Sequence, residues 1–375
     1  MNKKLMAVAV AGALAAPALA FAQASTVQIY GLINAEYGYY DQPNNAAGLG
    51  RSNVDALNSG ASRIGFKGEE KLAGSLSAFF QCESDLRFLG GNATTEGAWC
   101  DRNSAIGLKG GWGSFYVGTW DSPLKRVSGI TRITNETGWT GTQLMTLSNG
   151  GAWAGTFSNR NAHSMNYDTP NWNGFSASIQ YTTLQAARNL PANNVPTPKG
   201  RRVSISGQYV SGPMAIVGGY SKHDDDRSVS GVAGLDDKAW LIGGTYTWGA
   251  FKVGLTYIDA EISTGTVLLP GTTKRKSWNI AGDWNLGGPH AVRFGYANAG
   301  DAKTSVGGGN DTGAQLWQIG YIHTLSKRTQ ASFTYARMNN DTAGTYTLTG
   351  ASLGTQGIMA GENSAVFALG LVHTF

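Results

Sequence analysis

Residues 240–257 read Trp240-Leu-Ile-Gly-Gly-Thr-Tyr-Thr-Trp248, then Gly249-Ala250, then Phe251-Lys-Val-Gly-Leu-Thr-Tyr257. In the first run, Trp240, Ile242 and Tyr246 alternate with Gly243, Thr245 and Thr247. Successive residues of a β-strand point to opposite faces, so a period of two predicts a strand with one apolar and one wet face. The Gly-Ala step between the two runs predicts a tight turn, and the whole stretch reads as a hairpin.

The same alternation recurs along the chain. It is clearest around Trp278, Ile280 and Trp284, around Val292, Phe294 and Tyr296, around Trp317, Ile319 and Tyr321, and in the last residues, where Phe367, Leu369, Leu371 and Phe375 share a face. A soluble sandwich or propeller would alternate too. Here, however, the wet face carries Thr, Ser, Asn, Gln and charges in segment after segment, and aromatic residues gather near the strand ends. Both features favour a barrel with a solvated interior and an outer surface in lipid.

The connections between these strands alternate in length. Short turns are predicted at residues 109–113, 171–174, 211–213, 248–250, 287–289 and 326–328. Long loops are predicted near residues 41–59, 87–101, 121–160, 185–199, 224–236, 260–273, 300–311 and 340–361. Short turns at one rim and long loops at the other are typical of outer-membrane barrels, and the count gives about sixteen strands. The predicted fold class is therefore all-β: a transmembrane antiparallel β-barrel.

Composition agrees with this class and excludes others. The chain has 53 Gly, 15 Tyr and 11 Trp, and only 14% of its residues are charged. No segment after the N-terminus approaches the run of about 18 apolar residues that a transmembrane helix needs. Residues 1–24 have the form of a signal peptide, with Lys3 and Lys4 before an apolar run and Ala22-Gln-Ala24 as the cleavage site. Cleavage after Ala20 is a second option, but residues 25–375 are the expected barrel.

The expected mature chain would carry a net charge of about +3, because it loses two of its 29 basic residues and keeps its 24 acidic ones. A charge so close to zero does not support a nucleic-acid partner.

Residues 121–160 interrupt the strand pattern with a long segment that carries Asp121, Lys125, Arg126, Arg132 and Glu136. Insertions of this length inside a compact chain are uncommon and usually functional. We expect this segment to have no regular structure, to fold into the barrel mouth and to narrow a water-filled pore. The alternative is a mobile surface loop.

The two cysteines, Cys82 and Cys100, bracket a Gly-rich loop in a chain expected to be exported. An even count in an oxidising compartment favours a disulfide that closes this loop, and two free thiols are the alternative. The five histidines are scattered along the chain without metal-type spacing, and no catalytic motif is present. We therefore expect no enzymatic activity, no metal and no cofactor.

Several stretches resemble the general diffusion porins of Gram-negative outer membranes, in particular the trimeric sixteen-stranded kind of β-proteobacteria. They are Val27-Gln-Ile-Tyr-Gly-Leu-Ile33, Ser62-Arg-Ile-Gly-Phe-Lys-Gly-Glu-Glu70 with Leu72-Ala-Gly-Ser-Leu76, Tyr167-Asp-Thr-Pro170 with Asn173-Gly-Phe175, Leu325-Ser-Lys-Arg-Thr329, and the final Phe375. The resemblance implies a homotrimer and a third extracellular loop that folds inward at residues 121–160. It also implies a channel for the passive diffusion of small hydrophilic solutes.

The resemblance further implies an arginine ladder on the barrel wall that faces this loop. Arg63 and Arg160 match it, and the alternation places both on the lumen side. Arg102 also matches, but it shares its parity with Ile106 and Leu108, so either a bulge turns it inward or Asn103 is the lumen residue.

Glu83 matches a carboxylate on the wall, and Asp121 matches the first acidic residue of the loop. Arg126 and Arg132 complete the expected constriction from the loop side. Because arginine keeps its proton, this cluster predicts a preference for anions. For each arginine, the alternative is an ordinary ion pair at the rim. For the whole molecule, the alternative is an adhesin or an enzyme that uses the long loops.

Overall fold

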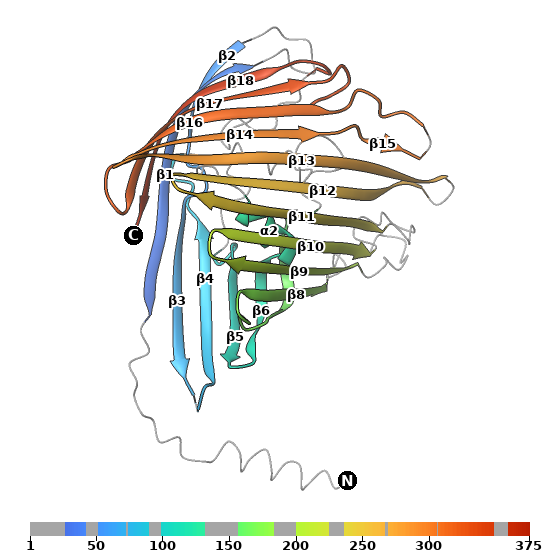
Figure 1. Ribbon diagram of the computed structural model, residues 1–375. Coiled ribbons are helices and arrows are strands. Elements are labelled where there is room, and N and C mark those ends of the chain that lie inside the picture. The colour runs from blue at the N-terminus through green and yellow to red at the C-terminus, as the bar shows by residue number, and fades with distance from the viewer. Residues whose placement is uncertain are drawn as a thin grey trace.

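The computed structural model describes residues 27–42, 52–72, 74–89, 99–131, 157–183, 200–224, 236–266, 269–305, 307–348 and 359–375. Its strands are β1 (Gln28–Gln42), β2 (Ser52–Asn58), β3 (Arg63–Lys71), β4 (Ser77–Asp85), β5 (Ser104–Gly110), β6 (Gly113–Asp121), β7 (Arg160–Asp168), β8 (Phe175–Thr183), β9 (Arg201–Ser211), β10 (Met214–Asp224), β11 (Asp237–Trp248), β12 (Phe251–Thr266), β13 (Leu269–Gly287), β14 (His290–Ala299), β15 (Lys303–Thr304), β16 (Ala314–Thr324), β17 (Thr329–Asn340) and β18 (Ser364–Thr374). One helix, α2 (Pro123–Ile130), follows β6 (Figure 1). The described residues contain no helix long and apolar enough to cross a membrane.

The strands close into an antiparallel barrel. From β3 to β14 each strand pairs with the next, β14 pairs with β16, and β18 pairs with both β17 and β1. Strands β2 and β3 both pair with β1, so they form one barrel strand that is interrupted at residues 59–62. Strand β15 is a two-residue addition to β13. Within the described residues the barrel therefore has sixteen strands, which confirms the predicted fold class.

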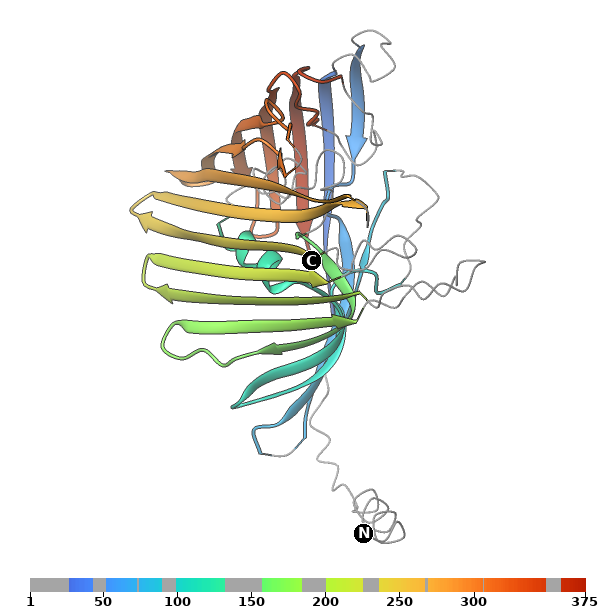
Figure 2. The same cartoon turned by 90° about the vertical axis from the view of Figure 1, so that its right-hand side faces the viewer.

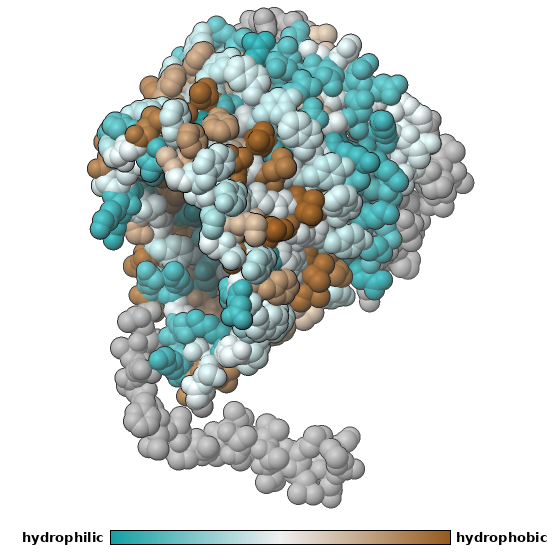
Figure 3. Space-filling model, viewed as in Figure 1, coloured by the Kyte–Doolittle hydropathy of each residue, from teal (hydrophilic) through white to brown (hydrophobic). Residues whose placement is uncertain are grey.

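Alternation along each strand separates an outer apolar surface from a polar inner one. On β12, Leu255 is 54% exposed, whereas the next residue, Thr256, is 2% exposed. Trp240, Ile242 and Tyr246 on β11 are exposed in the same way, while Thr245 between them is buried. The aromatic and aliphatic side chains predicted to face lipid thus lie on the outside of the barrel (Figure 3).

Helix α2 packs against the inner wall of β8–β11 (Figures 1 and 2). Its start is specified locally, because the Ser122 side chain accepts a hydrogen bond from the Lys125 backbone N–H and Pro123 occupies the first turn. Leu124 and Val127 are buried, and the Leu124 N–H donates to Ser204 Oγ at 3.2 Å. The prediction of a segment without regular structure was therefore wrong at its beginning.

A second segment lines the interior. Residues 341–348 follow β17 and carry Tyr346 and Leu348, which are 3% and 2% exposed. They belong to the same buried cluster as Ala297, Ala299 and Leu316 on the inner wall. At this end of the barrel several inner-wall side chains are small and apolar, and residues 341–348 cover them.

The predicted short turns are confirmed by the strand bounds, and a further one joins β3 to β4 at residues 72–76. Two predicted loops were wrong in part. Residues 260–273 continue the β12–β13 hairpin almost to its tip, and residues 52–58 form β2. Gly265, Pro270 and Gly271 suggested a loop, but the cross-strand hydrogen bonding of a long hairpin outweighs their weak strand preference.

Candidate functional site

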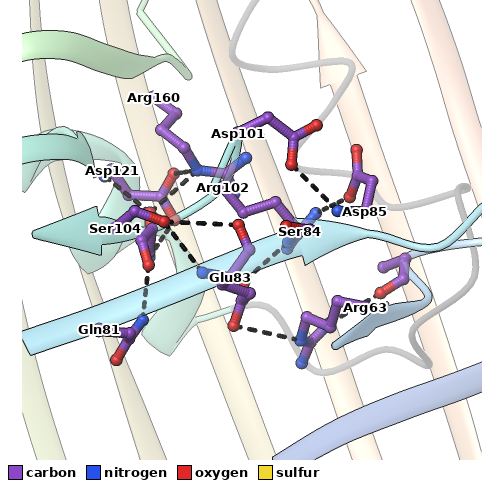
Figure 4. A network of polar contacts seen from close by, with 12 residues as sticks. Arg63, Gln81, Glu83, Ser84, Asp85, Asp101, Arg102, Ser104, Asp121 and Arg160 are labelled. Atoms are coloured by element: carbon purple, nitrogen blue, oxygen red, sulfur yellow. Dashed lines mark hydrogen bonds and ion pairs between the residues drawn. The ribbon is translucent and has the colours of Figure 1, made fainter. Parts of the chain in front are cut away.

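The charged residues singled out in the sequence lie on neighbouring strands. Strands β3 to β7 follow one another around the barrel, and their registers place Gly65 opposite Glu83 and Arg63 opposite Asp85. Because opposite residues share a face, these side chains all point to the inner side. Figure 4 shows the resulting network of polar contacts.

Glu83 is the centre of one half of the network. The residue is 7% exposed, and its Oε1 accepts a hydrogen bond from Arg102 Nε at 2.7 Å. Its Oε2 accepts one from the Tyr30 hydroxyl at 3.1 Å and lies 3.9 Å from Arg63 Nε. Arg102 also reaches Asp85, with Nη1 2.6 Å from Oδ1. Two arginines therefore share the carboxylates of β4.

Asp121 is the centre of the other half. Its Oδ1 lies 3.2 Å from Arg160 Nε and 2.8 Å from Lys125 Nζ. Asn103 connects the three chain segments, because its Oδ1 accepts hydrogen bonds from Arg160 Nε and from the Asp121 backbone N–H. Burial lowers the pKa of the Lys125 ammonium, and the adjacent Asp121 offsets this only in part. Lys125 is the one side chain of this group that comes from α2.

Arg126, one residue further along α2, holds the helix to the wall at a separate point. Its two Nη atoms contact the two carboxylate oxygens of Asp168 at 2.8 and 3.1 Å. The Tyr116 hydroxyl donates to the same carboxylate at 3.0 Å. This two-point contact is the strongest geometry available to an arginine and a carboxylate, so it fixes the side chain as well as neutralising it.

The structure brings together most of the residues that the sequence singled out. Arg63, Glu83 and Arg102 meet in one half of the network, and Arg160 and Asp121 meet in the other. Arg132 and Glu136 lie outside the described residues.

The parity argument against Arg102 was wrong. Strand β5 begins only at Ser104, and Cys100 has a left-handed backbone with φ 63°, so strand alternation does not extend back to residue 102. Asn103, the alternative, lies in the same network.

The sequence analysis singled out Glu83 and Asp121 but missed the other carboxylates that balance these cations. Asp85 stands two residues after Glu83 and so shares its face, which is a signal that parity could have given. Asp168 lies in the Tyr167-Asp-Thr-Pro170 stretch, which was used only as a family marker. The described cluster contains the cations Arg63, Arg87, Arg102, Lys125, Arg126 and Arg160 and the carboxylates Glu83, Asp85, Asp101, Asp121 and Asp168. The surplus is one positive charge.

The cations remain accessible despite their partners. Their side chains are between 17% (Arg102) and 45% (Arg87) exposed. Arg160 engages Asp121 and Asn103 through Nε alone, and within the described residues its two Nη groups make no hydrogen bond. A guanidinium has five N–H donors, so Arg160 keeps four that can bind a passing anion.

The disulfide is confirmed. Cys82 on β4 and Cys100 are bonded, with their Cα atoms 4.7 Å apart. The bond closes the loop that precedes Arg102, and the Cys100 N–H donates to Ser84 Oγ at 2.9 Å. It therefore ties the chain on both sides of Glu83 and limits how far Arg102 can move.

The histidines are less scattered than the sequence suggested. His290 on β14 lies opposite His323 on β16, and their Nδ1 atoms are 3.4 Å apart. In the described part of the chain, no group of three or more His, Cys, Asp or Glu residues is arranged to hold a metal ion.

Comparison with known proteins identifies the family to which this fold belongs. The family model described as Gram-negative porin matches residues 7–343. The chain belongs to the Gram-negative porin family. It is an outer-membrane porin that forms a water-filled channel for the passive diffusion of small hydrophilic solutes and ions. The family and the fold point to a channel rather than to an enzyme.

Individual relatives agree. Outer membrane porin protein 32 of Delftia acidovorans is 28% identical over 377 residues, and the match covers 100% of each chain. Major outer membrane protein P.IB of Neisseria gonorrhoeae is 31% identical over 188 residues, which is 48% of each chain. Among solved structures, the anion-selective porin from Comamonas acidovorans superimposes with a TM-score of 0.76 at 25% identity, covering 94% of this porin and 100% of that chain.

Proposed function

We propose that this porin prefers anions and that the cluster on β3–β7, with α2 opposite part of it, is the selective constriction of the pore. The observation that carries the proposal is Arg160. Its carboxylate partner, Asp121, contacts only Nε, so the two Nη groups of this permanently charged guanidinium remain available to solutes. The similarity to a structure described as an anion-selective porin also supports a preference for anions over cations.

The preference should be modest. Five carboxylates lie among the six cations, so the surplus is a single positive charge. A unit charge acting over about 4 Å in water amounts to about 1 kcal/mol, which corresponds to a permeability ratio of roughly two to five. A weak site of this kind lets ions leave as readily as they enter.

We further propose that the rest of residues 121–160 continues inward from α2 as an extracellular loop, that residues 1–24 are removed as a signal peptide, and that the porin is a homotrimer. The contacts of α2 with the inner wall support the first point. The Vibrio cholerae OmpT structure, described as a trimer form, shares the fold at 18% identity and makes a trimer a reasonable assembly for this chain.

The test of selectivity is the zero-current potential of the porin in a planar bilayer across a potassium chloride gradient. In the wild type, we expect a zero-current potential whose sign indicates a preference for chloride over potassium. In Arg160→Ala, the ratio of chloride to potassium permeability should be close to one. Arg160→Lys, which keeps the charge, should retain most of the preference.

Arg293→Ala is the matched control for position. Arg293 is an inner-wall arginine on β14 that pairs with Asp283 at 2.7 Å, outside the cluster. Its removal should change the ratio less than Arg160→Ala does. A cation-selective wild type would refute the anion preference. Equal effects of the two alanine variants would mean that overall lumen charge, and not this cluster, sets the preference.

A further inference from the structure

A row of lysines crosses the outer surface near the long-loop rim. The strand registers place Lys238 opposite Glu261, Glu261 opposite Lys274, and Lys274 opposite Lys303. Lys276 lies two residues from Lys274 on the same strand and face. All four lysines are exposed. We call Lys238, Lys274, Lys276 and Lys303 the lysine band.

The band faces outward. Lys276 and Lys274 share their parity on β13 with Trp278 and Ile280, which are 39% and 37% exposed on the outer wall. Arg275, between the two lysines, points the other way: it is 4% exposed and lies 5.3 Å from the centre of the Tyr346 ring inside the barrel. Strand alternation thus splits the Lys-Arg-Lys run, and both lysines remain outside.

The band carries more positive charge than its neighbours balance. Glu261 lies between Lys238 and Lys274, with its carboxylate oxygens 3.6 and 2.9 Å from their Nζ atoms. Asp259 is the cross-strand neighbour of Lys276. Lys276 and Lys303 make no ion pair within the described residues. Four lysines therefore stand against two carboxylates. The next lysine along the row, Lys222, is excluded from the band because Asp224 and Asp236 both pair with it.

The position of the band is as informative as its charge. Trp240 lies in the same cross-strand row as Asp259 and Lys276, and Trp278 follows Lys276 on the same face, so the lysine band borders the apolar outer belt. Figure 3 shows hydrophilic residues gathered over the ends of these strands, beside hydrophobic ones. Because the porin sits in the outer membrane, a row just beyond the apolar belt lies in the headgroup layer.

We propose that the lysine band binds phosphate-bearing lipid headgroups of the leaflet that meets the long-loop rim. Neighbouring strands are about 4.8 Å apart and same-face residues about 6.6 Å apart along a strand, so Lys274, Lys276 and Lys303 can surround one phosphate. The acyl chains of such a lipid would extend along Trp278 and Trp240. Lysine binds phosphate as a point charge, which suits headgroups that differ in shape and share a phosphomonoester.

The test uses the full barrel in a nonionic detergent, with bound lipid counted by native mass spectrometry during titration. The two probes are dioleoyl phosphatidic acid, which has a phosphomonoester, and dioleoyl phosphatidylcholine, in which choline compensates the phosphate. The wild type should bind phosphatidic acid more tightly. Lys276→Gln/Lys303→Gln removes two lysines without leaving a paired carboxylate behind, and it should weaken binding of phosphatidic acid roughly thirty-fold.

Lys327→Gln/Arg328→Gln, on the exposed turn between β16 and β17 at the opposite rim, is the matched control and should bind as the wild type does. Lys276→Arg/Lys303→Arg should also retain binding. Equal wild-type affinity for the two lipids, or unchanged affinity in Lys276→Gln/Lys303→Gln, would overturn the proposal. Competition by millimolar inorganic phosphate would overturn it too, because a free-phosphate site needs no lipid.

Discussion

At the scale of single residues, the wall cluster separates charges that hold the structure from charges that remain available to ions. Arg126 uses both Nη atoms on Asp168, and so it fastens α2 to the wall. Arg160 uses Nε alone. The two arginines have the same charge, yet we expect substitution of Arg160 to change selectivity and substitution of Arg126 mainly to loosen the helix.

Lys125 makes part of the selectivity dependent on pH. Burial lowers its pKa below that of an exposed lysine, so it loses its proton earlier as the pH rises, while the arginines stay charged. The anion preference should therefore fall on the alkaline side before exposed lysines titrate. The measurement is the zero-current potential as a function of pH, and Lys125→Arg should remove this step. Identical pH profiles of the wild type and Lys125→Arg would assign the change to other groups.

The family resemblance singled out Arg63 and Arg160, and strand parity placed both among the inward-facing side chains. Their contacts with Glu83 and Asp121 agree with this placement. Strand parity failed at Arg102 because residues 101–103 precede β5 and follow Cys100, whose backbone is left-handed. The sharing of Asp121 between Arg160 and Lys125 had local signals. Asp121 and Arg160 are cross-strand neighbours at the ends of β6 and β7, and Lys125 stands four residues after Asp121 at the start of α2. The contact with Lys125 was missed because the helix was missed.

At the scale of elements, the docking of α2 depends on inward-facing glycines. A Cβ atom on Gly219 would lie 3.2 Å from a Val127 methyl group and 3.4 Å from Leu124 Cα. Gly219→Val should overpack this contact, at a cost of about 1 to 3 kcal/mol, and push α2 towards the pore axis. The single-channel conductance should fall. Gly218→Val is the control, because the nearest atom to a Cβ there is the Leu241 carbonyl oxygen at 3.8 Å. Equal conductance in both variants would place α2 outside the ion path.

The disulfide should stabilise the β4–β5 hairpin that carries Glu83 and Arg102. Its cysteines are 18 residues apart, and closing a loop of this length contributes about 3 kcal/mol in the chain-entropy model. Cys82→Ser/Cys100→Ser should therefore unfold at lower urea concentration than the wild type, as followed by tryptophan fluorescence. A reducing agent should lower the wild-type midpoint and leave the variant unchanged. Equal midpoints in the absence of reductant would show that the bond adds no stability.

Among the elements, hairpins with tight turns were predictable, because alternation and Gly-rich turns specify them locally. The helix was missed even though Ser122 and Pro123 form a helix start, since eight residues are too few to show a helical period. The extension of β12 and β13 past residue 260 was missed because their glycines and proline imitate a loop. The inward packing of residues 341–348 is a tertiary contact without a local signature.

At the scale of the whole molecule, the proposed trimer gives a direct expectation. Unheated protein from outer membranes should migrate on a denaturing gel as a band of three chains, and heating should convert it to the monomer. Mass spectrometry of the same material should find the N-terminus at Ser25. A barrel that stays monomeric in mild detergent would refute the assembly without affecting the channel.

A diffusion channel needs a continuous aqueous path through the closed sixteen-stranded barrel, although α2 and residues 341–348 both occupy its interior. The most direct measurement is a planar-bilayer recording of the purified porin. We predict discrete conductance steps of uniform size, whose amplitude rises in proportion to the potassium chloride concentration because ions pass through water. Protein that is correctly folded and inserted, yet gives no conductance steps, would show that the barrel holds no open aqueous path.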